Sequence, residues 1–182
     1  MGLDKNRQLA IHWLEKSVAL GNHAACCIMG HVFFEDESPD YKTAAAWYLR
    51  GANAGHVDSM SEIGWMYWRG RGVEQDFKLE EQWFRKAISG KQTNAVKHLV
   101  EMQMDRVKRL EFELSKEDAQ FIWDLLQSHV TQPYAKYWMA LYFYSQGQPD
   151  IVDKDLDKAR ALMLEVLHDY KDASSWISQW VL

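Results

Sequence analysis

Apolar and small residues recur along the chain in a pattern that repeats every 34 to 40 residues. A tryptophan stands at the same place in four repeats, at Trp13, Trp47, Trp83 and Trp123, and Leu162 takes that place in a fifth. The intervals between these five anchors are 34, 36, 40 and 39 residues. A fixed period of this length indicates a repeat architecture in which each repeat is one supersecondary unit. The pattern predicts a helix around each anchor.

A second helix is predicted after each anchor helix. A small residue follows each anchor by twelve positions, and an apolar residue follows the first four anchors by sixteen. The small residues are Ala25, Ser59, Ala95, Ala135 and Ser174, and the apolar residues are Met29, Ile63, Leu99 and Met139. In the fifth repeat Ala173 fits the small position better than Ser174, which leaves two registers open. Each repeat is therefore predicted to be a pair of antiparallel helices.

Turn and cap residues separate these helices. Asp40 and Asp76 precede anchor helices, and a short carboxylate there accepts hydrogen bonds from free first-turn amides. Gly21 and Gly55 fall where the chain must reverse, which favours a left-handed backbone. Gly30, like Gly64 one repeat later, lies in the middle of a predicted helix. Glycine there lowers helix stability by about 1 kcal/mol relative to alanine, so its recurrence indicates that another helix packs closely against it.

The residues Asp40 to Val73 carry a pattern that resembles a known family. They read A-x-x-W-Y, a glycine, A/S-x-x-x-I-G-x-x-Y and G-x-G-V, which resembles the Sel1-like repeat, an α/α unit related to the tetratricopeptide repeat. Residues 10–33 follow the pattern well and residues 76–99 in part. The run from Asp105 to Ser115 has no counterpart and is predicted to extend a helix, with Ser115 and Asp118 capping the next one.

This resemblance implies an all-α superhelical solenoid of about five helix pairs in a single domain. The predicted units are roughly 4–36, 40–73, 76–110, 115–147 and 153–182. The resemblance further implies a non-enzymatic adaptor that binds a peptide or another protein. An immunity-type inhibitor that neutralises a cognate toxin is the alternative, and an enzyme or metal-binding protein is less favoured. Because stacked pairs form an extended curved surface, that surface is the expected binding site.

The predicted binding residues lie on the first helix of each pair, which we expect to line the concave side. A helical projection with the anchors inward places these side chains outward, together with Ala45. They are Gln8, His12, Glu15, Lys42, Leu49, Lys78, Gln82 and Arg85. Trp65 and Trp68 are surplus to the repeat pattern, so at least one of them is expected to face outward as a second candidate surface.

Charge and cysteine content limit the classes of partner and the cellular compartment that we expect. The formal net charge of -5 is spread without a basic stripe, so no nucleic-acid partner is expected. Cys26 and Cys27 are adjacent and cannot easily form a disulfide with each other, which favours a reducing compartment. With no apolar run of membrane length, the chain is predicted to be cytoplasmic, with no membrane partner.

Two further features concern metal binding and the oligomeric state. His23, Cys27 and His31 are potential zinc ligands four residues apart, but steps of four drift around a helix, so we predict no metal site and no cofactor. Trp176 and Trp180 make the C-terminal helix apolar. It either packs inward and seals the solenoid, which favours a monomer, or mediates self-association.

Overall fold

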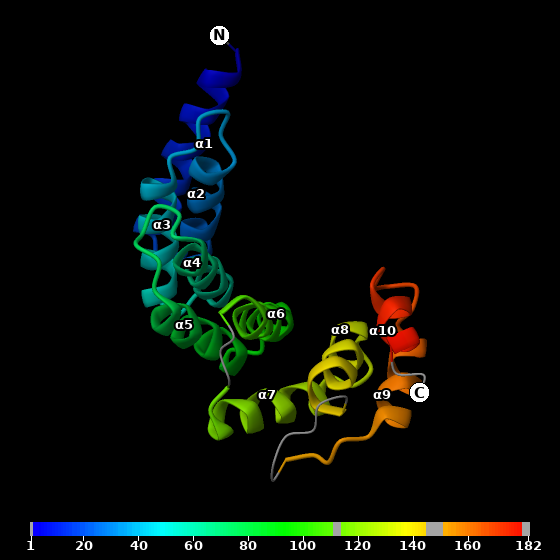
Figure 1. Ribbon diagram of the computed structural model, residues 1–182. Coiled ribbons are helices and arrows are strands. Elements are labelled where there is room, and N and C mark those ends of the chain that lie inside the picture. Colours follow the sequence, from blue (N-terminus) through cyan, green and yellow to red (C-terminus); the bar gives the residue numbers. More distant parts are fainter. Residues whose placement is uncertain (1, 111–113, 145–150, 180–182) are drawn as a thin grey trace. The chain divides into compact units, whose positions relative to one another are not determined.

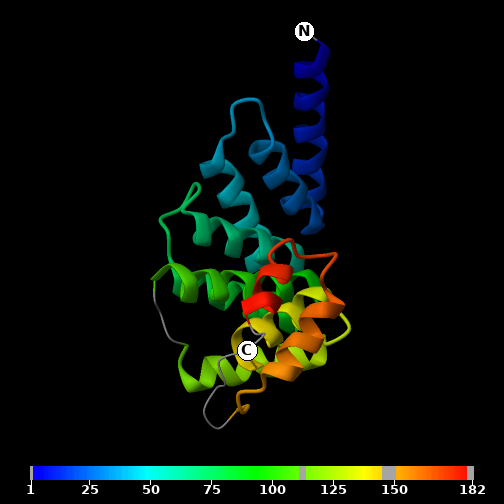
Figure 2. The same ribbon diagram turned by 45° about the vertical axis from the view of Figure 1, so that its right-hand side comes forward.

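A computed structural model describes residues 2–110, 114–144 and 151–179, and over these ranges the chain consists of helices joined by short turns (Figures 1 and 2). The helices are α1 (Gly2–Ala19), α2 (Ala24–Phe34), α3 (Tyr41–Asn53), α4 (Val57–Arg69), α5 (Phe77–Ser89), α6 (Thr93–Leu110), α7 (Lys116–Ser128), α8 (Pro133–Trp138), the π-helix η1 (Met139–Tyr144), α9 (Leu156–Glu165) and α10 (Ala173–Gln179). The predicted all-α arrangement in five helix pairs is confirmed. None of the described helices is long and apolar enough to cross a bilayer.

The chain forms two compact units, unit 1 (Met1–Met102) and unit 2 (Gln103–Leu182). In unit 1, α2 packs on α3, α3 on α4 and α4 on α5, so consecutive helices are neighbours (Figure 1). α6 begins in unit 1 and extends without a break to Leu110, which confirms the predicted helix extension from Asp105 as far as Leu110, while residues 111–113 lie outside the described residues. That the whole chain is one domain stays a prediction.

The core of unit 1 is built from the repeating small and apolar positions. Ala25, Ser59 and Ala95 are at most 1% exposed, because a small side chain lets neighbouring helices approach. Met29, Ile63 and Leu99 are equally buried. Both sets of predicted second-helix positions in this unit are therefore confirmed.

The anchor tryptophans differ from the prediction. Trp13 is 59% exposed, Trp47 is half-buried, and only Trp83 is buried in unit 1. Trp47 packs on residues of the preceding helix pair. The Trp13 ring instead makes a cation–π contact with Lys16 of the same helix, whose ammonium lies 4.7 Å from the ring centroid.

The aromatic residue after the anchor carries the core instead. Tyr48 is 1% exposed and Phe84 is fully buried. A Cβ on Gly30 would lie 2.2 Å from the ring of Tyr48, and one on Gly64 would lie 2.9 Å from Phe84, so the predicted close helix packing at both glycines is confirmed. Ala45, predicted to face outward, is 3% exposed because this side of α3 packs into the same cluster.

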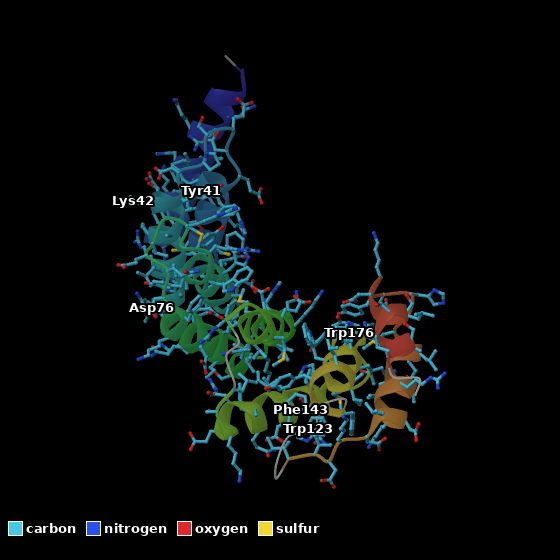
Figure 3. The ribbon with its side chains drawn as sticks, viewed as in Figure 1. Tyr41, Lys42, Asp76, Trp123, Phe143 and Trp176 are labelled. Atoms are coloured by element: carbon cyan, nitrogen blue, oxygen red, sulfur yellow. The ribbon has the colours of Figure 1, made fainter. Side chains whose placement is uncertain are left out.

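The predicted turns and caps are confirmed. Gly21 and Gly55 both have a φ of 88°, which only glycine adopts without strain. The Asp76 carboxylate, labelled in Figure 3, accepts from the amides of Lys78 and Leu79 at 2.8 and 3.0 Å. The Asp40 carboxylate caps α3 by accepting from the amide of Thr43 at 3.0 Å. Ser115 caps α7 by accepting from the amide of Asp118 at 3.1 Å.

Unit 2 has an aromatic core. The rings of Trp123 and Phe143 lie 4.9 Å apart between α7 and η1 (Figure 3). Tyr137 stacks on Tyr170 with ring centroids 4.1 Å apart, and its hydroxyl donates to Asp172. The wider turn of η1 places six consecutive buried residues, Met139–Tyr144, against their neighbours, which the sequence pattern did not predict.

The C-terminal helix is the second helix of the fifth pair, as predicted. Ala173 is buried and Ser174 is exposed, which settles the register in favour of Ala173. Trp176 is half-buried, while Trp180 lies outside the described residues. The choice between sealing and self-association, and with it the monomeric state, stays a prediction.

Candidate functional site

Unit 1 has a pocket of about 460 Å³ on the side formed by α2, α4 and the first turns of α6. We call this side the pocket face. The pocket is lined by Cys27, His31 and Phe34 of α2, Asp58, Ser61, Glu62 and Trp65 of α4, Phe84 of α5, Gln92, and Asn94 and His98 of α6. A pocket of this size lies in the range of about 300–1,000 Å³ that is usual for ligand sites.

Helical spacing explains why these side chains meet. In α4 the buried stripe is Ser59, Ile63 and Met66, and it faces α3 and α5. The pocket stripe begins one residue earlier, at Asp58, and returns at Ser61, Glu62 and Trp65, that is at i+3, i+4 and i+7. In α2 the corresponding stripe is Cys27, His31 and Phe34. Each helix therefore presents one face to the core and an adjacent face to the pocket.

Two helices of the pocket face pack directly on each other. α2 packs on α4, whereas no comparable packing joins α1 to α3 or α3 to α5 among these described helices. That the first helix of each pair lines the concave side stays a prediction, because the repeat pattern is compatible with curvature in either direction.

His31 joins the pocket to the core. Its Nδ1 shares a hydrogen bond with the Tyr48 hydroxyl at 2.9 Å, and its Nε2 lies 3.7 Å from the Sγ of Cys27. Burial raises the pKa of Cys27 to about 11. A thiol with that pKa stays protonated at neutral pH, so the Cys27–His31 pair is poorly suited to nucleophilic catalysis.

The two carboxylates of the pocket have different surroundings. Asp58 accepts a hydrogen bond from Nε2 of Gln92 and lies 3.9 Å from Nε2 of His56. Glu62 receives no hydrogen bond and no ion pair from the described residues. Burial raises the pKa of the Glu62 carboxyl, and Asp58 and Glu35 raise it further, although His31 acts in the opposite direction. Glu62 is the carboxylate that is available to a ligand.

Aromatic rings form the apolar walls. The rings of Phe34 and Trp65 meet edge to face with their centroids 5.5 Å apart. The ring centroids of Phe84 and His98 lie 6.4 Å apart. Burial lowers the pKa of His98, which favours its neutral form. The Oγ of Ser61 is buried with no hydrogen-bond partner, which is uncommon for a buried hydroxyl.

The residues predicted from the sequence are divided between two surfaces. Trp65 lines the pocket, and Trp68 lies beside it on α4, where Arg69 stacks 3.6 Å from its ring centroid. The others lie on α1, α3 and α5, which we call the outer face (Figure 3 labels Lys42 there). They are Gln8, His12, Glu15, Lys42, Lys78 and Gln82, all exposed, with Leu49 and Arg85 partly buried. None of these eight lines the pocket, and their role in binding stays a prediction.

Sequence analysis missed Glu62, Asp58 and His98 as a group. The polar and aromatic stripe Asp58, Glu62 and Trp65, spaced i, i+4 and i+7, was visible as a second face beside the core stripe. His31 was considered only as a metal ligand. Among the described residues no group of three or more His, Cys, Asp or Glu side chains is arranged to hold a metal ion.

Comparison with known proteins gives a consistent family match. The family model described as Sel1 repeat matches residues 1–22, 23–56, 57–91 and 133–165, more than half of the chain. Two of these segments, 23–56 and 57–91, begin at or just before a helix of the pocket face, α2 or α4, and end just past the following helix. The family repeat therefore starts one helix later than the pairs predicted from the sequence. No curated protein sequence matches the chain.

Two solved structures share the fold. A Sel1 repeat protein from Oxalobacter formigenes superimposes with a TM-score of 0.69 at 22% identity, over 96% of this chain and 69% of that chain. A protective antigen with an SLR fold, present in uropathogenic Escherichia coli strains, superimposes with a TM-score of 0.70 at 16% identity. That match covers 93% of this chain and 39% of the antigen chain, so this chain spans well under half of it.

Proposed function

Because the chain belongs to the Sel1 repeat family, whose fold is typically a non-catalytic scaffold for protein interactions, we propose that it binds an exposed segment of a partner protein on the pocket face of unit 1. The pocket is the observation that supports this choice of face. It gathers side chains from three helices, α2, α4 and α6, so one bound segment would contact several repeats at once. Aromatic anchors set in a pocket are the usual source of binding energy at protein interfaces.

The chemistry of the pocket favours binding over catalysis. Its one thiol has a pKa of about 11, and its histidine His31 is held by Tyr48 and Cys27 rather than placed against a hydroxyl nucleophile. The outer-face residues predicted from the sequence remain a second proposed contact surface. They are dispersed and mostly exposed, and exposed charges on helices contribute little to affinity one by one.

A pair of variants separates the two faces. Asn94→Trp places a bulky ring at the mouth of the pocket from an exposed position of α6, and Lys78→Glu with Arg85→Glu reverses charge on the outer face. With a partner captured by the wild-type chain, isothermal titration calorimetry is expected to show affinity reduced about tenfold or more by Asn94→Trp and unchanged by the outer-face pair. The opposite result would move the binding surface to α1, α3 and α5.

A further inference from the structure

Of the two carboxylates of the pocket, that of Glu62 is the one that accepts no hydrogen bond from the described residues. It lies in a partly buried position between the second turn of α4 and the aromatic side chains, and no described residue donates a hydrogen bond to it. Taking a charge out of water is unfavourable unless a partner compensates for the lost hydration. A carboxylate kept in such a position lowers the stability of the free protein and favours a ligand that supplies donors.

Among the neighbouring groups His31 favours the charged form of Glu62, but it makes no hydrogen bond or ion pair with that carboxylate. Both ring nitrogens of His31 are engaged by Tyr48 and Cys27, and Asp58 repels Glu62 rather than pairing with it. Burial favours the neutral form of His98. No lysine or arginine occurs among the lining residues, all of which are described. The pocket is therefore complementary to a positive charge brought by another molecule.

The walls restrict which cation fits. Phe34 and Trp65, which are both half-buried, offer apolar surface for a chain of methylene groups and flat faces for a planar group, whereas Phe84 is fully buried behind them. Arg69 and Arg71 already lie 5.9 and 5.2 Å from the Trp65 ring centroid, so that ring is surrounded by the chain's own cations. The carboxylate of Glu62, rather than the tryptophan, is what distinguishes a charged from a neutral occupant.

We propose that the pocket receives an arginine side chain from the partner protein, with its guanidinium group paired to the carboxylate of Glu62. This inference rests on the proposed function, since it names the side chain that the bound segment inserts. Guanidinium is planar, weakly hydrated and able to donate two parallel hydrogen bonds to one carboxylate, and it stacks on aromatic rings. Lysine has the same charge but is more strongly hydrated and has no flat surface, so it is expected to bind more weakly.

The test uses two probes that differ only in charge and in one terminal group. Acetyl-arginine-amide and acetyl-citrulline-amide are titrated separately into the full chain, and the side-chain resonances of His31, His98 and Trp65 are followed by NMR. The arginine probe is expected to shift these resonances in a saturable way. Citrulline, which is nearly the same shape but neutral, is expected to bind at least about tenfold more weakly, because a charge-assisted hydrogen bond is lost.

A matched pair of variants assigns the effect to Glu62. Glu62→Gln keeps the shape of the side chain and is expected to weaken binding of the arginine probe about tenfold or more, while raising the melting temperature of the free chain. Glu74→Gln makes the same charge change at an exposed position outside the pocket and is expected to alter neither. A merely structural Glu62 would lower the melting temperature when replaced.

Three results would overturn the inference. They are no saturable shift with the arginine probe, equal binding of the citrulline probe, and unchanged binding by the Glu62→Gln variant. If a captured partner binds wild type and Glu62→Gln equally well but is blocked by Asn94→Trp, the inference fails and the proposed function stands. If Asn94→Trp also has no effect on the partner, the pocket face itself is not the binding surface.

Discussion

Replacing Gly30 with alanine tests the contact between α2 and α3, in which Gly30 packs on the ring of Tyr48. A Cβ at this position would lie 2.2, 2.4 and 2.7 Å from three ring atoms of Tyr48, well inside contact distance. Tyr48 is 1% exposed, and its hydroxyl is held by His31 at 2.9 Å. The ring therefore cannot move aside without disturbing both the core and the pocket histidine.

Two opposing effects determine how much the Gly30→Ala substitution changes the free energy of unfolding. Forcing a methyl group into a packed core costs about 1–3 kcal/mol, and replacing a mid-helix glycine with alanine gains about 1 kcal/mol. Because three ring atoms of a fully buried side chain are involved, we expect the upper end of the first range and a net loss of about 2 kcal/mol. Urea unfolding followed by circular dichroism at 222 nm should show the midpoint lowered by about 1 M with an unchanged slope.

Gly64→Ala provides the matched comparison. Its Cβ would lie 2.9–3.3 Å from the ring of Phe84, a milder overlap, so the gain in helix propensity offsets most of the loss. We expect this variant to be within about 1 kcal/mol of wild type. If Gly30→Ala proved as stable as wild type, or more stable than Gly64→Ala, the close packing of α2 on Tyr48 would be refuted.

Core, cap and pocket residues of unit 1 can each be tested separately. Tyr48→Ala should cost about 3–5 kcal/mol by thermal unfolding and Trp47→Ala only about 1–2, and equal losses would contradict the core assignment. Asp76→Ala should cost about 1 kcal/mol through the lost cap, and an unchanged melting temperature would show that the cap is not needed. The folded pKa of Glu62 is raised, so the extra stability of Glu62→Gln at pH 7 should shrink as pH falls through that pKa; a constant difference would argue against the shift. With its pKa of about 11, Cys27 should react with iodoacetamide at pH 8 far more slowly in the folded chain than in urea, as mass spectrometry can measure.

Backbone requirements made the helix pairs predictable from sequence. Gly55 needs a positive φ, Asp76 caps exposed amides, and Ala25 must be small where helices meet, and each requirement acts over a few residues. These constraints are local, so the sequence pattern contains them in full. The helix boundaries could be inferred for the same reason, whereas the close contact at Gly30 was inferred from the recurrence of glycine at the same place in the next repeat, Gly64.

Positions that depend on packing between helix pairs were less predictable. Trp47 and Tyr48 are adjacent aromatic residues about 100° apart on a helix, and either could have faced the core. The structure buries Tyr48 because Gly30 of the preceding helix leaves room for its ring. Trp13 is exposed, although the repeat pattern alone does not distinguish it from Trp47 or Trp83.

The candidate site was not predicted because it depends on packing between helices of different pairs. The repeat pattern does not contain the direct packing of α2 on α4. Once that packing is known, the stripe containing Glu62 and Trp65 follows from helical spacing. The absence of a hydrogen-bond partner for Glu62 within the described residues depends on three helices together and could not be inferred from one of them.

Site-specific photo-cross-linking asks directly whether the pocket face of unit 1 binds a partner protein. A photoreactive phenylalanine is placed at Asn94 at the pocket and, in a second variant, at Lys42 on the outer face; both positions are exposed. If the pocket face is the binding surface, irradiation in the source cell gives a covalent adduct with one protein from position 94, competed by free arginine amide, and none from position 42. An adduct from position 42 alone would refute binding at the pocket face.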